Sequence, residues 1–191
     1  MKTLVIYDSV YGNTEQIART IGGAIAGEVQ GLRAGEANPS EVQGVDLLLV
    51  GAPTQGGRPT PAARDFLDQI PAQALNGVRV AAFDTRIPAK WAAIFGYAAR
   101  GIARRLKKKG RTLVAPPEGF FVSGAEGSLL DGELERAANW AKEISARELK
   151  IISRNRGPRW VGPGTSDAPP ASIIYDAGYA GLDLAIRKGL R

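Results

Sequence analysis

The chain has 191 residues, of which 44% are hydrophobic and 23% are charged, and its formal net charge is +6. This composition is typical of a globular domain and argues against disorder over most of the length. The sequence contains no cysteine and no histidine, which excludes disulfides, thiolate nucleophiles, cysteine-bound metal centres and imidazole-based catalysis. We therefore expect no catalytic side chain and no metal ligand, so that any redox chemistry belongs to a bound cofactor.

Five segments are predicted as strands, most of them because they are continuous apolar runs of the kind that a parallel sheet buries on both faces. They are Thr3–Tyr7, the edge strand Gln30–Arg33, Val45–Ala52, Val78–Phe83, and a last strand that Pro116-Pro117 divides into Thr112–Ala115 and Phe120–Val122. No apolar run reaches the roughly 18 residues that a membrane span needs. Because Met1 leads directly into the first strand, we expect no signal peptide and a cytoplasmic protein.

Helices are predicted between the strands from apolar residues at helical spacing. The first follows Thr14, and the second begins with Thr60 as N-cap and Pro61 at the first helical position. A third helix is predicted between Trp91 and Lys109, and Asp131 is predicted to cap a final helix. The inward face of that final helix is expected to carry Leu134, Ala137, Ala138, Ala141 and Ile144.

The alternation of strands and helices predicts an α/β fold with a doubly wound parallel sheet. In such sheets, ligands bind beyond the carboxyl ends of the strands, where the strand order reverses. Three loops lie at that position, namely Asp8–Thr14, Pro53–Arg58 and Asp84–Ala89. We expect the functional site to be formed by these loops.

The first loop has the chemistry of a phosphate site. It offers two hydroxyls, an amide side chain and backbone N–H groups at a helix N-terminus, which can bind an anion without lysine or arginine. Neither GxxxxGK[ST] nor GxGxxG follows the strand, so a nucleoside triphosphate loop is excluded. The alternative is an ordinary strand–helix turn that Asn13 or Thr14 caps.

The stretch Val5-Ile6-Tyr7-x-Ser9-x-x-Gly12-x-Thr14-x-x-x-Ala18-x-x-Ile21 resembles the FMN-binding signature of the flavodoxin family. The resemblance extends from Met1 to about Arg147. It implies a five-stranded sheet in the order 2-1-3-4-5 and non-covalent FMN, with an FMN-binding domain over residues 1–147. It also implies that the phosphate is held by Ser9, Gly12, Asn13 and Thr14, with backbone amides from Val10 and Tyr11.

The same resemblance places the second loop beside the reactive edge of the isoalloxazine ring. The loop residues concerned are Pro53, Thr54, Gln55, Gly56 and Gly57. Gln55 stands where many flavodoxins carry a stacking tryptophan, so an aromatic sandwich at that point is in doubt. The Gly56-Gly57 pair can let a peptide turn toward flavin N5, because glycine accepts positive φ. A plain turn before a helix is the alternative.

By the resemblance, the third loop contacts the pyrimidine side of the ring through Asp84, Thr85 and Arg86. Alternatively, Asp84 and Arg86 only pair with each other. Positive charges at Arg58 and Arg86 beside the ring would make the flavin potential less negative than in acidic flavodoxins. Three aromatic residues are candidates for stacking on the ring, although aromatics at helical spacing belong more often to the core. They are Trp91, Phe95 and Tyr97.

Two basic regions remain. The residues Arg104, Arg105, Lys107, Lys108, Lys109 and Arg111 form a dense block that is either a solvated helix end or a docking surface for an acidic redox protein. Residues 148–191 are predicted as a basic, Pro- and Gly-rich extension that is poorly ordered, packs on the domain, pairs with a second subunit or lies on an anionic membrane surface. Nucleic-acid binding is not expected, because no recognised motif is present.

These observations lead to three hypotheses of function. The first is an FMN protein that passes electrons between redox partners. The second is an FMN-dependent oxidoreductase that uses NAD(P)H or a small quinone; Gln55 mildly favours this hypothesis and the next one over a low-potential electron carrier. The third, from another class, is a flavin-free interaction module on the same fold. The visible spectrum of the purified protein separates the third hypothesis from the other two.

Overall fold

The computed structural model describes residues 1–88 and 96–155. These residues form a five-stranded parallel sheet in the order β2-β1-β3-β4-β5. The strands are β1 (Lys2–Tyr7), β2 (Glu28–Arg33), β3 (Leu47–Pro53), β4 (Arg79–Arg86) and β5 (Glu118–Phe121). The predicted fold class and strand order are therefore confirmed.

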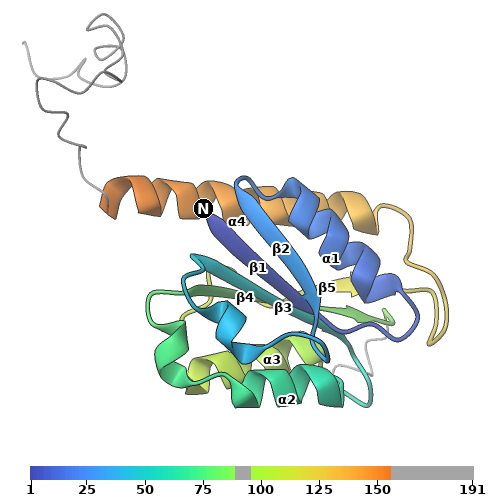
Figure 1. The fold of residues 1–191 in the computed structure, drawn as a ribbon. Helices are drawn as coiled ribbons and strands as arrows, with labels where there is room; N and C mark the ends of the chain where they lie inside the picture. The colour runs from blue at the N-terminus through green and yellow to red at the C-terminus, as the bar shows by residue number, and fades with distance from the viewer. Residues whose placement is uncertain (89–95, 156–191) are drawn as a thin grey trace, which may run out of the picture. The chain divides into compact units, whose positions relative to one another are not determined.

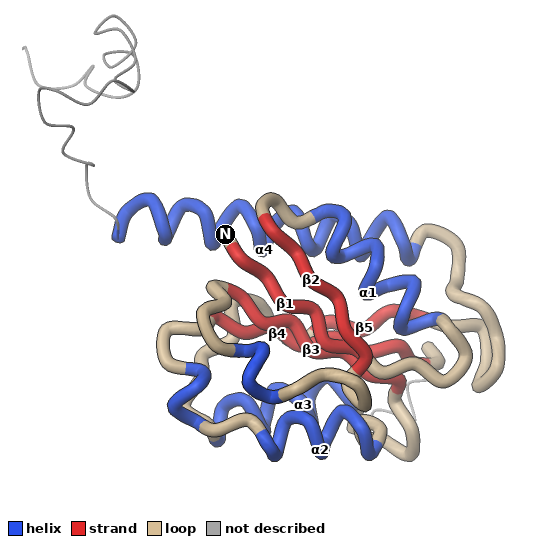
Figure 2. The backbone as a smooth tube through the Cα atoms, in the orientation of Figure 1, coloured by secondary structure: helices blue, strands red, loops and turns tan. Residues whose placement is uncertain are grey.

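Four α-helices cover the two faces of this sheet (Figure 1). They are α1 (Asn13–Ala24), α2 (Pro61–Gln69), α3 (Ala98–Lys108) and α4 (Glu133–Asn155), and two 3₁₀ turns lie at Pro39–Val42 and Ala72–Leu75. Helices α1 and α4 pack on one face, and α2 and α3 pack on the other, as the separation of red strands from blue helices in Figure 2 makes plain. None of the helices in the described residues is both long and apolar enough to cross a membrane.

The two faces of the sheet bury two separate apolar clusters. Leu48 and Val50 of β3 pack with Phe66 of α2 on one face. Leu47 and Leu49 point to the other face, because successive side chains of a strand alternate. The central strands β3 and β4 are thus buried on both faces, which explains their continuous apolar sequences.

Three predicted elements differ in detail from the structure. The last strand is Glu118–Phe121, and of the predicted segment Thr112–Ala115 only Leu113 makes an isolated parallel bridge, with Val80. The third helix begins at Ala98, because Gly96 has a φ of 90° and Tyr97 is extended at the N-cap. Its predicted beginning at Trp91 lies outside the described residues.

The ends of two helices also differ from prediction. Thr60 is the N-cap of α2, but its buried hydroxyl makes no cap hydrogen bond. In α4, Leu134 is exposed, and Glu133 takes the buried position in the first turn, where its carboxylate accepts a hydrogen bond from the Phe121 N–H. Asp131 makes no side-chain hydrogen bond within the described residues. Since α4 extends to Asn155, the division of the chain at residue 147 stays a prediction.

Candidate functional site

A cavity of about 310 Å³ lies at the carboxyl ends of β1, β3 and β4. This is the edge of the sheet where strand order reverses, and where α/β proteins bind their ligands. The volume is at the lower end of the range of small-molecule sites, about 300–1,000 Å³. The lining residues come from the ends of these strands and from the loop after β5: Ser9, Val10, Tyr11, Asn13, Thr14, Pro53, Thr54, Gln55, Gly56, Thr85, Arg86, Ile87, Val122, Gly124 and Ala125.

The cavity brings together most of the residues predicted from sequence. Three of them, Gly12, Gly57 and Asp84, do not line it. Four lining residues were not named as site residues: Ile87, which belongs to the third predicted loop, and Val122, Gly124 and Ala125. The signal for the last three was the topology itself, because the loop after β5 must reach the same sheet edge as the other parallel strands.

The first loop presents a row of free donors. Gly12 is the N-cap of α1 with a φ of 86°. Neither Asn13 nor Thr14 is the N-cap, and the Ser9 hydroxyl, which precedes the helix, accepts a hydrogen bond from the Glu15 N–H at 3.3 Å. Within the described residues, the backbone N–H groups of residues 10–14 have no hydrogen-bond partner. Such a run at a helix N-terminus favours an anion.

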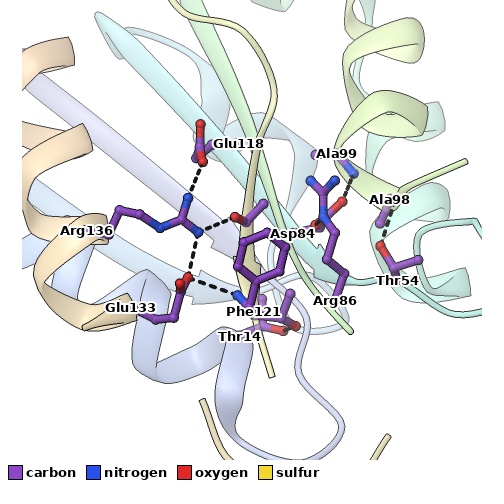
Figure 3. A network of polar contacts seen from close by, with 12 residues as sticks. Thr14, Thr54, Asp84, Arg86, Ala98, Ala99, Glu118, Phe121, Glu133 and Arg136 are labelled. Atoms are coloured by element: carbon purple, nitrogen blue, oxygen red, sulfur yellow. Dashed lines mark hydrogen bonds and ion pairs between the residues drawn. The ribbon is translucent and has the colours of Figure 1, made fainter. Parts of the chain in front are cut away.

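The hydroxyls of this site connect its loops. Thr14 Oγ1 lies 2.8 Å from Thr85 Oγ1, and both side chains are buried. Thr54 Oγ1 accepts a hydrogen bond of 2.9 Å from the N–H of Ala98, the first residue of α3 (Figure 3). The first and third loops are therefore held together directly, and the second loop is tied to α3.

The loop after β5 is held against the first loop. Asn13 Nδ2 donates to the Gly127 carbonyl at 2.7 Å, and the Tyr11 hydroxyl donates to Glu126 at 3.3 Å. Since Gly124 and Ala125 line the cavity, these two contacts position one of its walls. The Asn13 side chain acts here on protein structure, while its backbone N–H remains free.

The second loop is a tight hairpin around Gly56 and Gly57. Gln55 and Arg58 pair in antiparallel fashion, with two N–H to carbonyl hydrogen bonds of 3.0 Å. Both glycines have positive φ, 53° and 77°, as a two-residue type I′ turn requires. Gln55 and Gly56 face the cavity, whereas Gly57 and Arg58 line a second groove on the other side of the hairpin.

The Asp84 side chain is fully buried, and it has two hydrogen-bond partners in the described residues. Its carboxylate accepts hydrogen bonds from Arg86 Nε at 2.6 Å and from the Ala99 N–H at 2.8 Å (Figure 3). It thereby satisfies a donor in the first turn of α3, where the helix dipole favours an anion. Burial raises the pKa of the Asp84 carboxyl, and the Arg86 charge and the Ala99 N–H offset part of that rise.

Arg86 is held on several sides. Besides Asp84, its guanidinium lies 3.8 Å from the centre of the Tyr97 ring, and a Cβ at Gly119 would collide with it. The sequence leaves two alternatives for Arg86, a positive charge beside the ring or a pair with Asp84, and the structure shows the pair. Arg58 lines the second groove instead of the cavity. Neither residue therefore places an uncompensated charge against the cavity.

The mouth of the cavity is apolar. Val10, Tyr11 and Ile87 line it and are exposed by 51%, 55% and 43%. An apolar ligand ring would cover such side chains favourably. Of the three predicted stacking aromatics, Trp91 and Phe95 lie outside the described residues, and Tyr97 packs on Arg86 without lining the cavity.

The chain is similar to known proteins in sequence and in structure. The family model of flavodoxin matches residues 5–140. A flavodoxin from the domain Archaea is 22% identical, with a TM-score of 0.66, covering 78% of this chain and 99% of that one. Oxidised flavodoxin 2 from Bacillus cereus is 24% identical, with a TM-score of 0.63, covering 77% and 99%.

A larger protein contains the same fold. Rubredoxin oxygen:oxidoreductase from Desulfovibrio gigas is 18% identical, with a TM-score of 0.65, and the match covers 80% of this chain but 37% of that one. Because these identities are below 25%, the similarity to the solved structures shows only that the fold is shared. No curated protein matches the sequence.

Proposed function

Because the chain belongs to the flavodoxin family, we propose that it binds FMN non-covalently in the cavity at the carboxyl edge of the sheet and passes electrons between redox partners. FMN supplies the redox chemistry when bound, since its ring system takes up and releases electrons. The protein contributes binding, orientation and exclusion of water. No catalytic side chain is required for this function.

The observation that carries the proposal is the row of free N–H groups of residues 10–14 beside the cavity. A phosphate there would receive several hydrogen bonds and the favourable end of the α1 dipole. The hydroxyls of Ser9 and Thr14 are already engaged with Glu15 and Thr85. We therefore assign the phosphate to the backbone donors first, with these two hydroxyls as second partners.

The rest of the cavity suits a flat aromatic ring. Its mouth carries the exposed apolar side chains of Val10, Tyr11 and Ile87, and its walls offer Thr54, Gln55 and the backbone at Thr85. Amide and hydroxyl groups of this kind fit the polar edge of a flavin, whereas the apolar side chains fit its hydrophobic surface. The residues present are thus compatible with FMN.

Titration of the apoprotein with FMN and with riboflavin tests the assignment. Each lost hydrogen bond to a charged group costs about 1.5–3 kcal/mol, so riboflavin should bind far more weakly, as measured by quenching of flavin fluorescence. Gly12→Ala tests the loop, with Gly44→Ala as its matched control. Both glycines have positive φ and open space at the Cβ position, so both variants carry backbone strain alone.

Gly12→Ala should weaken FMN binding and leave riboflavin binding nearly unchanged, because the strain tilts the phosphate donors. Gly44→Ala should change neither affinity. Equal affinity of the parent protein for the two flavins would refute the phosphate site. Absence of the visible flavin bands, together with no FMN binding, would favour the flavin-free interaction module.

For the electron carrier, we propose an acidic redox protein as partner, because the chain has a net charge of +6 and opposite charge accelerates association. Half of the basic block is used within the protein: Arg105 pairs with Asp68, while Lys109 and Arg111 donate to backbone carbonyls. Lys107 and Lys108 are exposed and remain available. The electron-transfer rate should fall as salt is added.

A second candidate is an FMN-dependent oxidoreductase that takes electrons from NAD(P)H and gives them to a quinone. The observation that favours it is an arginine-lined groove beside the cavity. Steady-state oxidation of NADH and NADPH in the presence of a quinone separates the two candidates. Turnover of either nucleotide would favour the enzyme, and its absence in an FMN-loaded protein would favour the carrier.

A further inference from the structure

A groove of about 640 Å³ lies between the start of α2 and helix α3, on the far side of the Gln55–Arg58 hairpin from the cavity. Five of its lining residues are arginines, and none of the described lining residues is acidic. The arginines are Arg58, Arg64, Arg100, Arg104 and Arg105. This set is called the arginine groove below.

Among the residues that the structure describes, four of these five guanidinium groups have no hydrogen-bond or ion-pair partner. Within the described residues, the side chains of Arg58, Arg64 and Arg104 make no hydrogen bond or ion pair, and Arg100 only approaches the Tyr97 ring, at 5.7 Å. Arg64 Nε is even buried without a hydrogen-bond partner. Arg105 alone is paired, with Asp68 at 3.2 Å.

The other arginines whose side chains are described behave differently. Each of them pairs with a carboxylate or donates to a carbonyl: Arg19, Arg33, Arg79, Arg86, Arg111, Arg136 and Arg147. The guanidinium groups without a partner are therefore concentrated in one groove. This arrangement is unfavourable in the free protein, because Arg100 and Arg104 lie four residues apart on α3 and repel each other.

Two of the residues that line the groove are glycines whose neighbours come very close. Gly101 allows α3 to approach Pro59, since a Cβ there would lie 2.9 Å from Pro59 Cδ. Gly96 is close to Gly57 as well, with 3.4 Å between its Cβ position and the Gly57 carbonyl oxygen. The arginine side chains therefore surround a concavity, which a compact ligand can enter and a flat protein surface cannot fill.

We propose that the arginine groove binds a small molecule that carries two or more adjacent phosphate groups. Guanidinium groups match phosphate oxygens in a bidentate manner, and several converging on one hollow fit clustered anionic oxygens better than a single carboxylate. All five basic residues that line the groove are arginines. The lysines at residues 107–109, at the C-terminal end of α3, do not line it. Of these lysines, Lys107 and Lys108 are exposed outside the groove, so an acidic protein surface would meet them first.

The location of the groove suggests a role for this ligand, and this step rests on the proposed function. The hairpin separates the two sites by one turn, since Gln55 and Gly56 line the cavity while Gly57 and Arg58 line the groove. A ligand held by its phosphates in the groove would have its remaining part near the flavin cavity. Pyridine dinucleotides and nucleoside diphosphates both carry the required pyrophosphate group.

Calorimetric titration with inorganic pyrophosphate and with orthophosphate tests the site itself, without any need for flavin. We expect pyrophosphate to bind at least about tenfold more tightly than orthophosphate, because two groups engage more guanidinium donors. Arg100→Gln combined with Arg104→Gln should reduce pyrophosphate affinity by at least about tenfold. Both side chains are exposed, so the fold should tolerate the change, and circular dichroism checks this.

The matched control is Arg19→Gln combined with Arg147→Gln, which likewise removes two exposed helical arginines, from α1 and α4 on the opposite face of the sheet (Figure 1). It should leave pyrophosphate affinity unchanged. Equal losses in the control and in the Arg100→Gln/Arg104→Gln variant would overturn the proposal, because they would indicate nonspecific attraction to net charge. Tighter binding of a polyglutamate peptide or a single-stranded oligonucleotide than of pyrophosphate would also overturn it, in favour of a macromolecular partner.

Titrations with NADPH and ADP distinguish the sources of the pyrophosphate group. A pyridine dinucleotide should bind more tightly to the FMN-loaded protein than to the apoprotein, because the rest of the molecule would lie near the flavin, whereas the affinity for ADP should not depend on FMN. If FMN does not bind at all while pyrophosphate binds as expected, the proposed function fails and the phosphate site stands. If neither pyrophosphate nor NADPH binds, the site is refuted whatever the result with FMN.

Discussion

The hydroxyl oxygens of Thr14 and Thr85 lie 2.8 Å apart in the buried floor of the cavity, although 71 residues separate them in the sequence. Thr14 is in the first turn of α1, and Thr85 is near the end of β4. Their hydrogen bond joins the loop with the free N–H groups to the opposite wall of the cavity. The phosphate end and the ring end of the proposed FMN site are therefore mechanically connected.

Thr85→Val removes one hydroxyl with little change in shape and leaves the other buried without a partner. Such a group costs about 1–3 kcal/mol, so the free energy of unfolding in urea should fall by that amount. Thr14→Val should have a similar effect. The double variant should lose less than the sum of the two single changes, because neither hydroxyl then remains unpaired; strict additivity would show that the hydrogen bond contributes nothing.

The sequence allowed the strands, their parallel arrangement and the first loop to be predicted, because these depend on local patterns. Continuous apolar runs identify strands such as Leu47–Val50, which are buried on both faces. The free donors of the first loop follow from a strand that leads directly into a helix. These features can be predicted without knowing which residues from distant parts of the sequence contact them.

The partners of side chains could not be predicted in the same way. Asp84 and Arg86 are two residues apart, so their pairing was foreseeable as one of two alternatives. The second partner of Asp84, the Ala99 N–H, depends on how α3 packs. The arginine groove is lined by residues from 57–64 and from 96–105. It exists only because α2 and α3 lie beside each other on one face of the sheet. No local sequence pattern predicts that contact.

Arg86→Gln should strongly destabilise the protein. It leaves the Asp84 carboxylate fully buried without its cation, and breaking a buried pair in this way costs about 3–5 kcal/mol. Thermal or urea unfolding measures the loss. The matched control is Arg19→Gln, which breaks an exposed pair with Glu15 and should cost about 0.2–1 kcal/mol at most. Similar losses in the two variants would contradict a structural role for the Asp84–Arg86 pair.

The double variant Asp84→Asn/Arg86→Gln removes the two opposite charges together. Because the pair is neutral as a whole, the reduction potential of bound FMN should change little, as measured by spectroelectrochemistry at low salt. A clear fall of the potential would show instead that the positive charge of Arg86 acts on the flavin more strongly than the negative charge of Asp84. That result would support the expectation from sequence that the charge of Arg86 makes the flavin potential less negative.

Gly57→Ala tests the hairpin between the cavity and the arginine groove. With a φ of 77°, an alanine at this position costs about 1–2 kcal/mol, and the free energy of unfolding should fall accordingly. Gly57→Asn should cost less, because asparagine tolerates the left-handed region. If the two variants are equally stable, the hairpin has changed its turn type and the constraint on Gly57 does not hold.

Glu148 of α4 should make the stability of the protein depend on pH. Its side chain is only 2% exposed, and the Arg79 guanidinium lies 3.2 Å from Oε1, an oxygen that has no hydrogen-bond partner. Burial raises the pKa of Glu148 above its ordinary value of 4.5, and Arg79 offsets part of that rise. The folded protein therefore holds the Glu148 proton more tightly than the unfolded chain does.

The sign of the effect follows from this difference. Below pH 4.5 the carboxyl is protonated in both states, and as the pH rises through the raised pKa the folded state loses stability relative to the unfolded one. Glu148→Gln imitates the protonated form, so its free energy of unfolding should exceed that of the parent by an amount that grows over this interval and then levels off. Glu143→Gln, an exposed position of the same helix, should follow the parent at every pH. Urea unfolding across the interval gives the free energy of unfolding of the parent and of Glu148→Gln at each pH. If the two curves are parallel, the Glu148 carboxyl is ionised equally in the folded and unfolded states, and the Arg79 charge fully offsets the effect of burial on its pKa.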